Sequence, residues 1–82
     1  MFLQDVETDT IFNIKDCKKI GIRPNGTNTD GKPLFEIECI TYDGCSNIIA
    51  DNIQSYDEAL ILLKRLASKM ASANLFFNDF NL

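Results

Sequence analysis

Two strand-like segments joined by a tight turn constrain the fold of this chain more than any other feature. Residues 34–42 (LFEIECITY) alternate apolar and polar side chains, with one face formed by Phe35, Ile37 and Cys39 and the other by Glu36 and Glu38. Such alternation is expected of a strand in a sheet with one solvent-exposed face. Asp43-Gly44 follows at once and predicts a type I′ hairpin turn, in which both central residues have positive φ. Residues 45–53 then form the returning strand.

Two shorter strand-like runs precede this hairpin, at residues 10–14 (TIFNI) and 18–23 (KKIGIR). Residues 24–32 (PNGTNTDGK) contain two turn signals, Asn25-Gly26 and Asp30-Gly31, and predict a loop. Phe2 and Leu3 begin a further edge strand that turns at residues 7–9. We therefore expect an antiparallel meander of about five strands within residues 2–53.

A capped helix is predicted after the strands. Ser55 is followed three residues later by Glu58, which is the pattern of a capping box. Apolar residues then recur at helical spacing, at Ala59, Leu62, Leu63, Leu66 and Met70. The helix should extend over about residues 56–72. Because a sheet with one apolar face and a helix with one apolar stripe bury each other, residues 1–82 predict a single α+β domain.

The order of these segments resembles that of small uncharacterised proteins common in Gram-positive bacteria and in their phages and mobile elements. The segments that carry the resemblance are IFNIKDCKKIGI, FEIECITYDGCSNII and SYDEALILLKRLA, within residues 10–70. The resemblance implies a small curved sheet packed by one helix, similar to a reduced pleckstrin-homology barrel, and it brings no known active site. It also implies an accessory or anti-defence role against a host defence protein.

Charge and cysteine content bound the partners and the compartment. The formal charge of −4 predicts that the molecule as a whole repels nucleic acid. The odd number of cysteines and an N-terminal segment without a basic region predict a cytoplasmic protein with free thiols. Cys39 is expected in the core, and Cys17 and Cys45 at exposed turns. The longest apolar run, residues 59–63, is too short to span a membrane.

The sequence contains no catalytic or metal-binding set. Histidine is absent, so a Ser-His or Cys-His nucleophile pair is impossible, and no CxxC motif supports a zinc site. Residues 26–32 match GxxxxGK, but Pro33 stands where a phosphate-binding loop requires Ser or Thr. We therefore predict a protein that is not an enzyme and that binds no cofactor.

Acidic residues alternate near the N-terminus, at Asp5, Glu7 and Asp9. On a strand these carboxylates would line one face, and Glu36 and Glu38 could extend the row across the open face of the sheet. Such a row could hold a divalent ion weakly or mimic nucleic-acid phosphates. A solvated edge that discourages edge-to-edge pairing is the simpler explanation. Three basic residues of the neighbouring strand could also neutralise the row: Lys18, Lys19 and Arg23.

Two apolar features are candidates for a contact outside the core, although a lone exposed isoleucine is also normal. Ile61 falls on the polar side of the helix, and the C-terminal segment carries Leu75, Phe76, Phe77, Phe80 and Leu82. Burying each such side chain contributes roughly 1.5–3 kcal/mol, so the segment is either the last piece of the core or a contact with a second chain. The favoured interpretation is a non-enzymatic module acting through protein–protein contact, and a homodimer held by this segment with Ile61. An acidic nucleic-acid mimic that blocks a DNA-binding enzyme and a small-ligand-binding protein stay open as alternatives.

Overall fold

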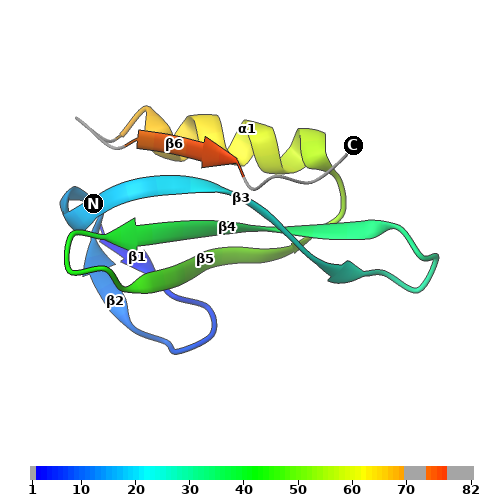
Figure 1. Ribbon diagram of the computed structural model, residues 1–82, viewed down its shortest axis with the longest axis horizontal. Coiled ribbons are helices and arrows are strands. Elements are labelled where there is room, and N and C mark those ends of the chain that lie inside the picture. Colours follow the sequence, from blue (N-terminus) through cyan, green and yellow to red (C-terminus); the bar gives the residue numbers. More distant parts are fainter. Residues whose placement is uncertain (1, 70–73, 78–82) are drawn as a thin grey trace.

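A computed structural model of the protein describes residues 2–69 and 74–77, the latter as backbone. Its elements in chain order are β1 (Phe2–Gln4), β2 (Ile11–Asn13), the 3-10 helix η1 (Ile14–Asp16), β3 (Cys17–Thr27), β4 (Pro33–Thr41), β5 (Ser46–Ile53), α1 (Tyr56–Ala67) and β6 (Asn74–Phe77). One sheet has the strand order β5-β4-β3-β6, and β1 and β2 form a separate two-stranded ribbon. Figure 1 shows α1 over one face of the larger sheet and the ribbon at one end, on the other side. The predicted α+β class is confirmed.

The antiparallel pairing of β3, β4 and β5 places the apolar residues on the face that contacts α1. Ile20 lies opposite Cys39 and Ile22 lies opposite Ile37. These residues pack with Ala59 and Leu63 of α1, and the core cluster also includes Cys17 and Phe35. Phe35 meets Tyr56 edge to face, with ring centroids 5.9 Å apart. Such a pair adds about 0.5–1.5 kcal/mol to the burial of the two rings.

The five predicted strands are present, but they are divided between two sheets, and a sixth strand is added. The first two strands leave the main sheet, and β6 joins it in parallel with β3, with Leu75 opposite Ile20 and Phe77 opposite Ile22. The described strands therefore form one sheet of two strands and one sheet of four strands. The backbone of residues 74–77 belongs to the protein's own sheet, whereas Phe80 and Leu82 lie outside the described residues.

The turn between β4 and β5 is not the predicted type I′ turn. Gly44 has φ 88°, but Asp43 is not among the residues with positive φ. The amide of Gly44 donates to Thr41 O at 2.9 Å, and the amide of Thr41 donates to Cys45 O at 3.0 Å. The Asp43 carboxylate accepts from the Cys45 amide at 3.1 Å and from the Thr41 hydroxyl. These bonds fix a three-residue loop that needs positive φ only at its last position.

A β-bulge overturns the prediction that Cys17 is exposed. Cys17 lies opposite Thr41 and Lys19 lies opposite Ile40, so Lys18 is one extra residue in β3. Because one inserted residue moves the preceding side chain to the other face, Cys17 faces the core. It is 3% exposed and is joined to Cys39 by a disulfide. The prediction of three free thiols is therefore wrong, and the free cysteine is the exposed Cys45.

Helix α1 begins as predicted and ends earlier than predicted. Ser55 Oγ accepts from the amide of Glu58 at 3.1 Å. At the other end the Ser68 hydroxyl donates to Arg65 O at 2.7 Å, a bond that competes with continued helix. Within the described residues, no helix is both long and apolar enough to cross a membrane.

Candidate functional site

The acidic residues of the predicted row do not lie on one surface. Asp5 is only 2% exposed, and its carboxylate accepts from three backbone amides: Glu7 at 2.8 Å, Thr8 at 3.1 Å and Ile48 at 3.2 Å. Burial opposes its ionisation, but these amides together outweigh that effect and lower the pKa of Asp5. Because the carboxylate folds residues 5–8 into a turn, the predicted strand with three aligned carboxylates does not form.

Glu36 and Glu38 are also buried, at 5% and 7% exposure, although the alternation had placed them on an open face. That face is covered in part, since the amide of Val6 donates to Ile48 O at 2.7 Å and ties the β1–β2 loop to β5. Arg23 Nη1 lies 2.8 Å from Glu38 Oε2, and Ser46 donates to the same carboxylate. Burial raises the pKa of Glu36, while the positive charge of Arg23 opposes the rise.

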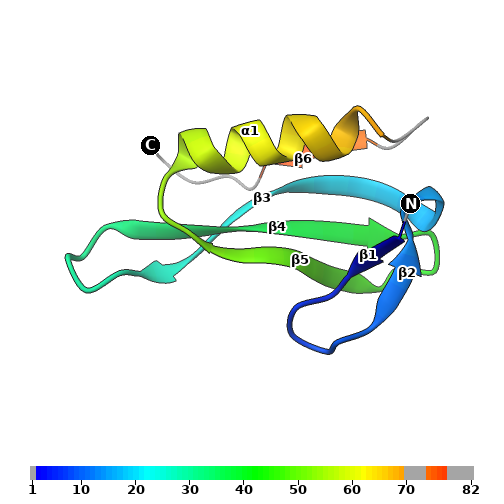
Figure 2. The same cartoon turned by 180° about the vertical axis from the view of Figure 1, so that it is seen from behind.

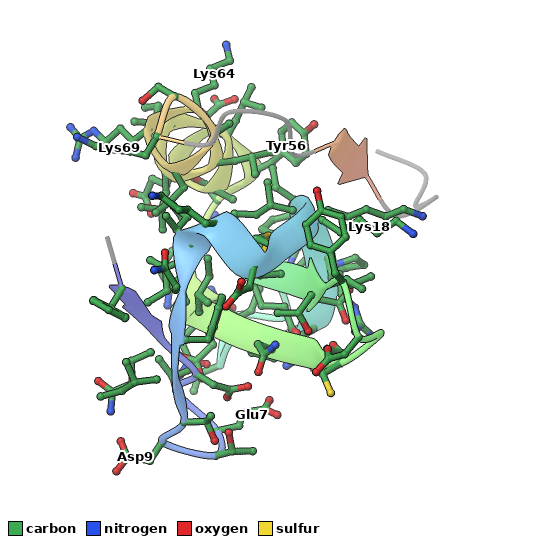
Figure 3. All side chains as sticks on the ribbon, turned by 90° about the vertical axis from the view of Figure 1, so that its left-hand side faces the viewer. Glu7, Asp9, Lys18, Tyr56, Lys64 and Lys69 are labelled. Atoms are coloured by element: carbon green, nitrogen blue, oxygen red, sulfur yellow. A yellow bond between two sulfur atoms is a disulfide. The ribbon has the colours of Figure 1, made fainter. Side chains whose placement is uncertain are left out.

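Glu7 and Asp9 are the exposed members of the predicted row. Figure 3 shows both residues on the β1–β2 loop, on the side of the sheet opposite α1. Lys64 and Lys69 extend from the α1 side. With the other three carboxylates buried, no continuous acidic row reaches the surface. Among the described residues, no group of three or more acidic or cysteine side chains could hold a metal ion. The structure therefore does not favour a divalent-ion site or a mimic of nucleic-acid phosphates at this row.

Exposed apolar side chains gather on the β1–β2 ribbon instead. Phe2 is 69% exposed, Ile11 66% and Val6 50%. Phe2 lies opposite Asn13, and Gln4 lies opposite Ile11, so Phe2 and Ile11 are diagonal neighbours on one face of the ribbon. We call Phe2, Val6 and Ile11 the ribbon patch. Figure 2 shows the ribbon near the N-terminal end of β5, on the side of the sheet away from α1.

Sequence reasoning missed the ribbon patch, although a signal for it exists. Ile11 and Phe12 are consecutive in a strand, so they point to opposite faces of the ribbon. A two-stranded ribbon that packs by one face therefore leaves one of the two exposed. Of the residues predicted for an interface, Ile61 is 57% exposed on α1, and Leu75, Phe76 and Phe77 form part of β6.

A pocket lies between the ribbon and the β4–β5 turn. Its volume is about 410 Å³, and it is lined by Thr10, Phe12, Asp16, Thr41, Tyr42, Asp43, Cys45 and Asn47. The amide of Tyr42 donates to Asp16 O at 3.1 Å, which joins η1 to the turn. Thr41 and Asn47 are buried, while Tyr42 is 62% exposed. The pocket is thus held between two backbone segments that are hydrogen-bonded to each other.

The titrating groups of the β4–β5 turn have opposite pKa shifts. Hydrogen bonds from the Thr41 side chain and the Cys45 amide lower the pKa of Asp43, so this carboxylate is ionised at neutral pH. The same carboxylate accepts a hydrogen bond from the Cys45 thiol, and its negative charge adds to that effect, which raises the pKa of Cys45. Since the thiolate is the reactive form, Cys45 is not an activated nucleophile.

Comparison of the chain with protein-family models, with curated proteins and with solved structures finds no match. The function is therefore argued from the residues of this chain.

Proposed function

We propose that the protein is a non-enzymatic module that binds another protein through the end formed by the ribbon and the β4–β5 turn. The observation that carries the proposal is the position of the exposed apolar residues. Of the five large apolar side chains exposed in the described residues, Phe2 and Ile11 lie on the ribbon, Val6 on the β1–β2 loop and Tyr42 on the turn, while Ile61 lies on α1. Apolar patches gathered at one place, with polar residues around them, are typical of interaction sites.

Charge around the ribbon patch indicates the kind of partner. Glu7 and Asp9 of the ribbon loop are exposed, as are Asp16 of η1 and Asp43 of the turn. An acidic rim around an apolar centre favours a protein partner with a basic rim, because complementary potentials speed association and exclude other partners. The resemblance to phage and mobile-element proteins supports a host defence protein as that partner, an accessory or anti-defence role, and a cytoplasmic location.

The test compares two variants of the tagged full-length protein in a co-purification from host cells. Phe2→Ser with Ile11→Ser removes the centre of the ribbon patch, and Ile61→Ser is the matched control on α1. We expect the double variant to lose a partner that the wild type and Ile61→Ser retain, with circular dichroism unchanged in all three. A specific partner that stays bound to the double variant would contradict the proposal.

Self-association through Ile61 and residues 75–82 is a second part of the proposal. A twofold contact is the commonest way for a small domain to cover a surplus of apolar side chains. Light scattering across a range of concentrations should show a dimer for the wild type and a shift toward monomer for Ile61→Ser. A wild type that stays monomeric at the highest concentration refutes this part alone.

Of the alternatives, the nucleic-acid mimic is not favoured, because the carboxylate row it requires is largely buried. The pocket between the ribbon and the turn favours the ligand-binding alternative.

A further inference from the structure

The side chains that line the pocket share one electrostatic character. Two carboxylates, Asp16 and Asp43, and two aromatic rings, Phe12 and Tyr42, line it together with hydroxyl, amide and thiol groups. None of the lining residues is a lysine or an arginine. A pocket of this composition has a negative potential, since the face of an aromatic ring is itself negative.

Neither carboxylate forms an ion pair with a described residue. Arg23–Glu38 is the only ion pair among the described residues. Neither Asp16 nor Asp43 therefore has a described lysine or arginine within salt-bridge distance. The Thr41 hydroxyl and the Cys45 amide hold Asp43 in place at the turn. These donors are neutral, so they orient the carboxylate without removing its charge.

We propose that this pocket binds an organic cation, namely an alkylammonium or guanidinium group with an apolar stem. Carboxylates attract the head group, and the two rings contact both the head group and the stem through cation–π and apolar interactions. A metal ion fits less well, because hard cations require several oxygen ligands and no group of three acidic or cysteine side chains converges in the described residues. The volume of about 410 Å³ is large enough to admit a single side chain or a small amine.

This chemistry has two sources, a lysine or arginine side chain of a protein partner and a free polyamine. The inference does not depend on the proposed protein-binding function, because it is tested on the isolated full chain with small probes. Nα-acetyl-lysine methylamide carries the side-chain ammonium group on a peptide unit. The second probe, 1,4-diaminobutane, carries ammonium groups on a free alkyl chain. N-acetyl-norleucine methylamide is the neutral control of similar shape.

The readout is the amide chemical shifts of the ¹⁵N-labelled protein during titration with each probe. We expect the cationic probes to shift the amides of Thr10, Thr41, Tyr42, Cys45 and Asn47 along one saturable curve, and the affinity to fall with added salt. Tighter binding of the lysine probe points to a partner side chain, and tighter binding of the diamine points to a free polyamine. Equal binding of the norleucine probe, or no saturable shift at these residues, would overturn the proposal.

Matched variants test the two carboxylates. Asp43→Asn keeps an oxygen that can accept from Thr41 and Cys45, so the turn is retained. With Asp16→Asn in the same chain, affinity for the cationic probe should fall by about tenfold or more, because both negative charges that attract the head group are removed. Asp30→Asn makes the same chemical change in the exposed β3–β4 loop at the other end of the molecule and should leave affinity unchanged (Figure 1). Unchanged affinity in the Asp16/Asp43 double variant would refute the proposal.

Discussion

Arg23 and Glu38 lie on adjacent strands, with Nη1 2.8 Å from Oε2, and they form the ion pair of the described residues. Glu38 is almost fully buried and Arg23 is the cation that compensates both it and Glu36. Replacing Arg23 by Met should therefore lower the free energy of unfolding by about 1–3 kcal/mol, because it leaves two buried carboxylates without a compensating cation. Urea unfolding measures this loss, and Lys32→Met in the exposed β3–β4 loop is the control.

A second change distinguishes the ion pair from simple loss of packing. Adding Glu38→Gln to Arg23→Met removes the uncompensated charge and should recover part of the lost stability. If the losses of stability of Arg23→Met and Glu38→Gln simply add in the double variant, the pair contributes no coupling energy.

Asp5 ties the β1–β2 loop to β5 through its bond from the Ile48 amide. Asp5→Ala should lower the free energy of unfolding at neutral pH by about 2–3 kcal/mol, because three amides lose a charged acceptor. The folded-state pKa of Asp5 lies below its ordinary value of 3.8, so the contribution is present above that pH. It is lost as the pH falls further, through the folded-state pKa. The difference in free energy of unfolding between Asp5→Ala and wild type, measured by urea unfolding, should therefore become smaller in acid. The exposed control Asp51→Ala should differ little from wild type at any pH.

Glu36 should show the opposite dependence on pH. Its pKa is raised above 4.5 in the folded protein by burial, so the unfolded chain ionises first as the pH rises. Below pH 4.5 wild type and Glu36→Gln should have similar stability, and above the raised pKa the variant should be more stable. Chemical unfolding across this range measures the difference. A variant less stable than wild type at neutral pH would mean that contacts of the charged carboxylate outweigh its burial.

The Cys17–Cys39 disulfide makes a prediction about thiol content. Under denaturing conditions without reductant, an alkylating reagent should modify Cys45 alone, and after reduction all three cysteines. Because the bond closes a loop between residues 22 positions apart, Cys17→Ala with Cys39→Ala should cost about 3 kcal/mol. Mass spectrometry counts the modified residues, and Cys45→Ala is the control for stability. Three modified residues without reduction would contradict the disulfide.

The pairing of β6 with β3 predicts that β6 protects the amides at this edge of β3 from hydrogen exchange. A chain that ends at residue 73 lacks the partner of residues 19–22, whereas a chain that ends at Phe77 keeps it. Hydrogen exchange in residues 19–22 should therefore be faster in the shorter chain, at the amides that do not bond to β4. Equal exchange in the two chains would mean that β6 does not protect this edge in solution.

Features set by neighbouring residues could be predicted from the sequence. The Ser55 cap depends on a contact three residues away, and the inward face of residues 35–39 depends on alternation within one strand. The inward position of Cys17 could not be predicted in this way. It depends on an extra residue at Lys18, and nothing in the local sequence indicates a bulge there.

The candidate site was predicted less well, because it depends on which surfaces are covered. Alternation correctly placed Glu36 and Glu38 on the face opposite the helix, but both are buried, and a loop from far earlier in the chain is bonded to β5 and covers that face in part. The pocket joins residues 10–16 to residues 41–47, and no sequence spacing indicates that contact. Residues 74–77 are too few for a periodic pattern, so their pairing with β3 was also missed.

The parallel pairing of β6 with β3 also has a consequence for synthesis on the ribosome. All other strands and the helix emerge before residues 74–77, so the nascent sheet can form while one side of β3 still has unpaired backbone groups. An unpaired edge is a template for any matching strand, including residues 74–77 of a neighbouring nascent chain. Chains translated close together on one messenger RNA can therefore exchange this strand, whereas a chain released alone closes its own sheet.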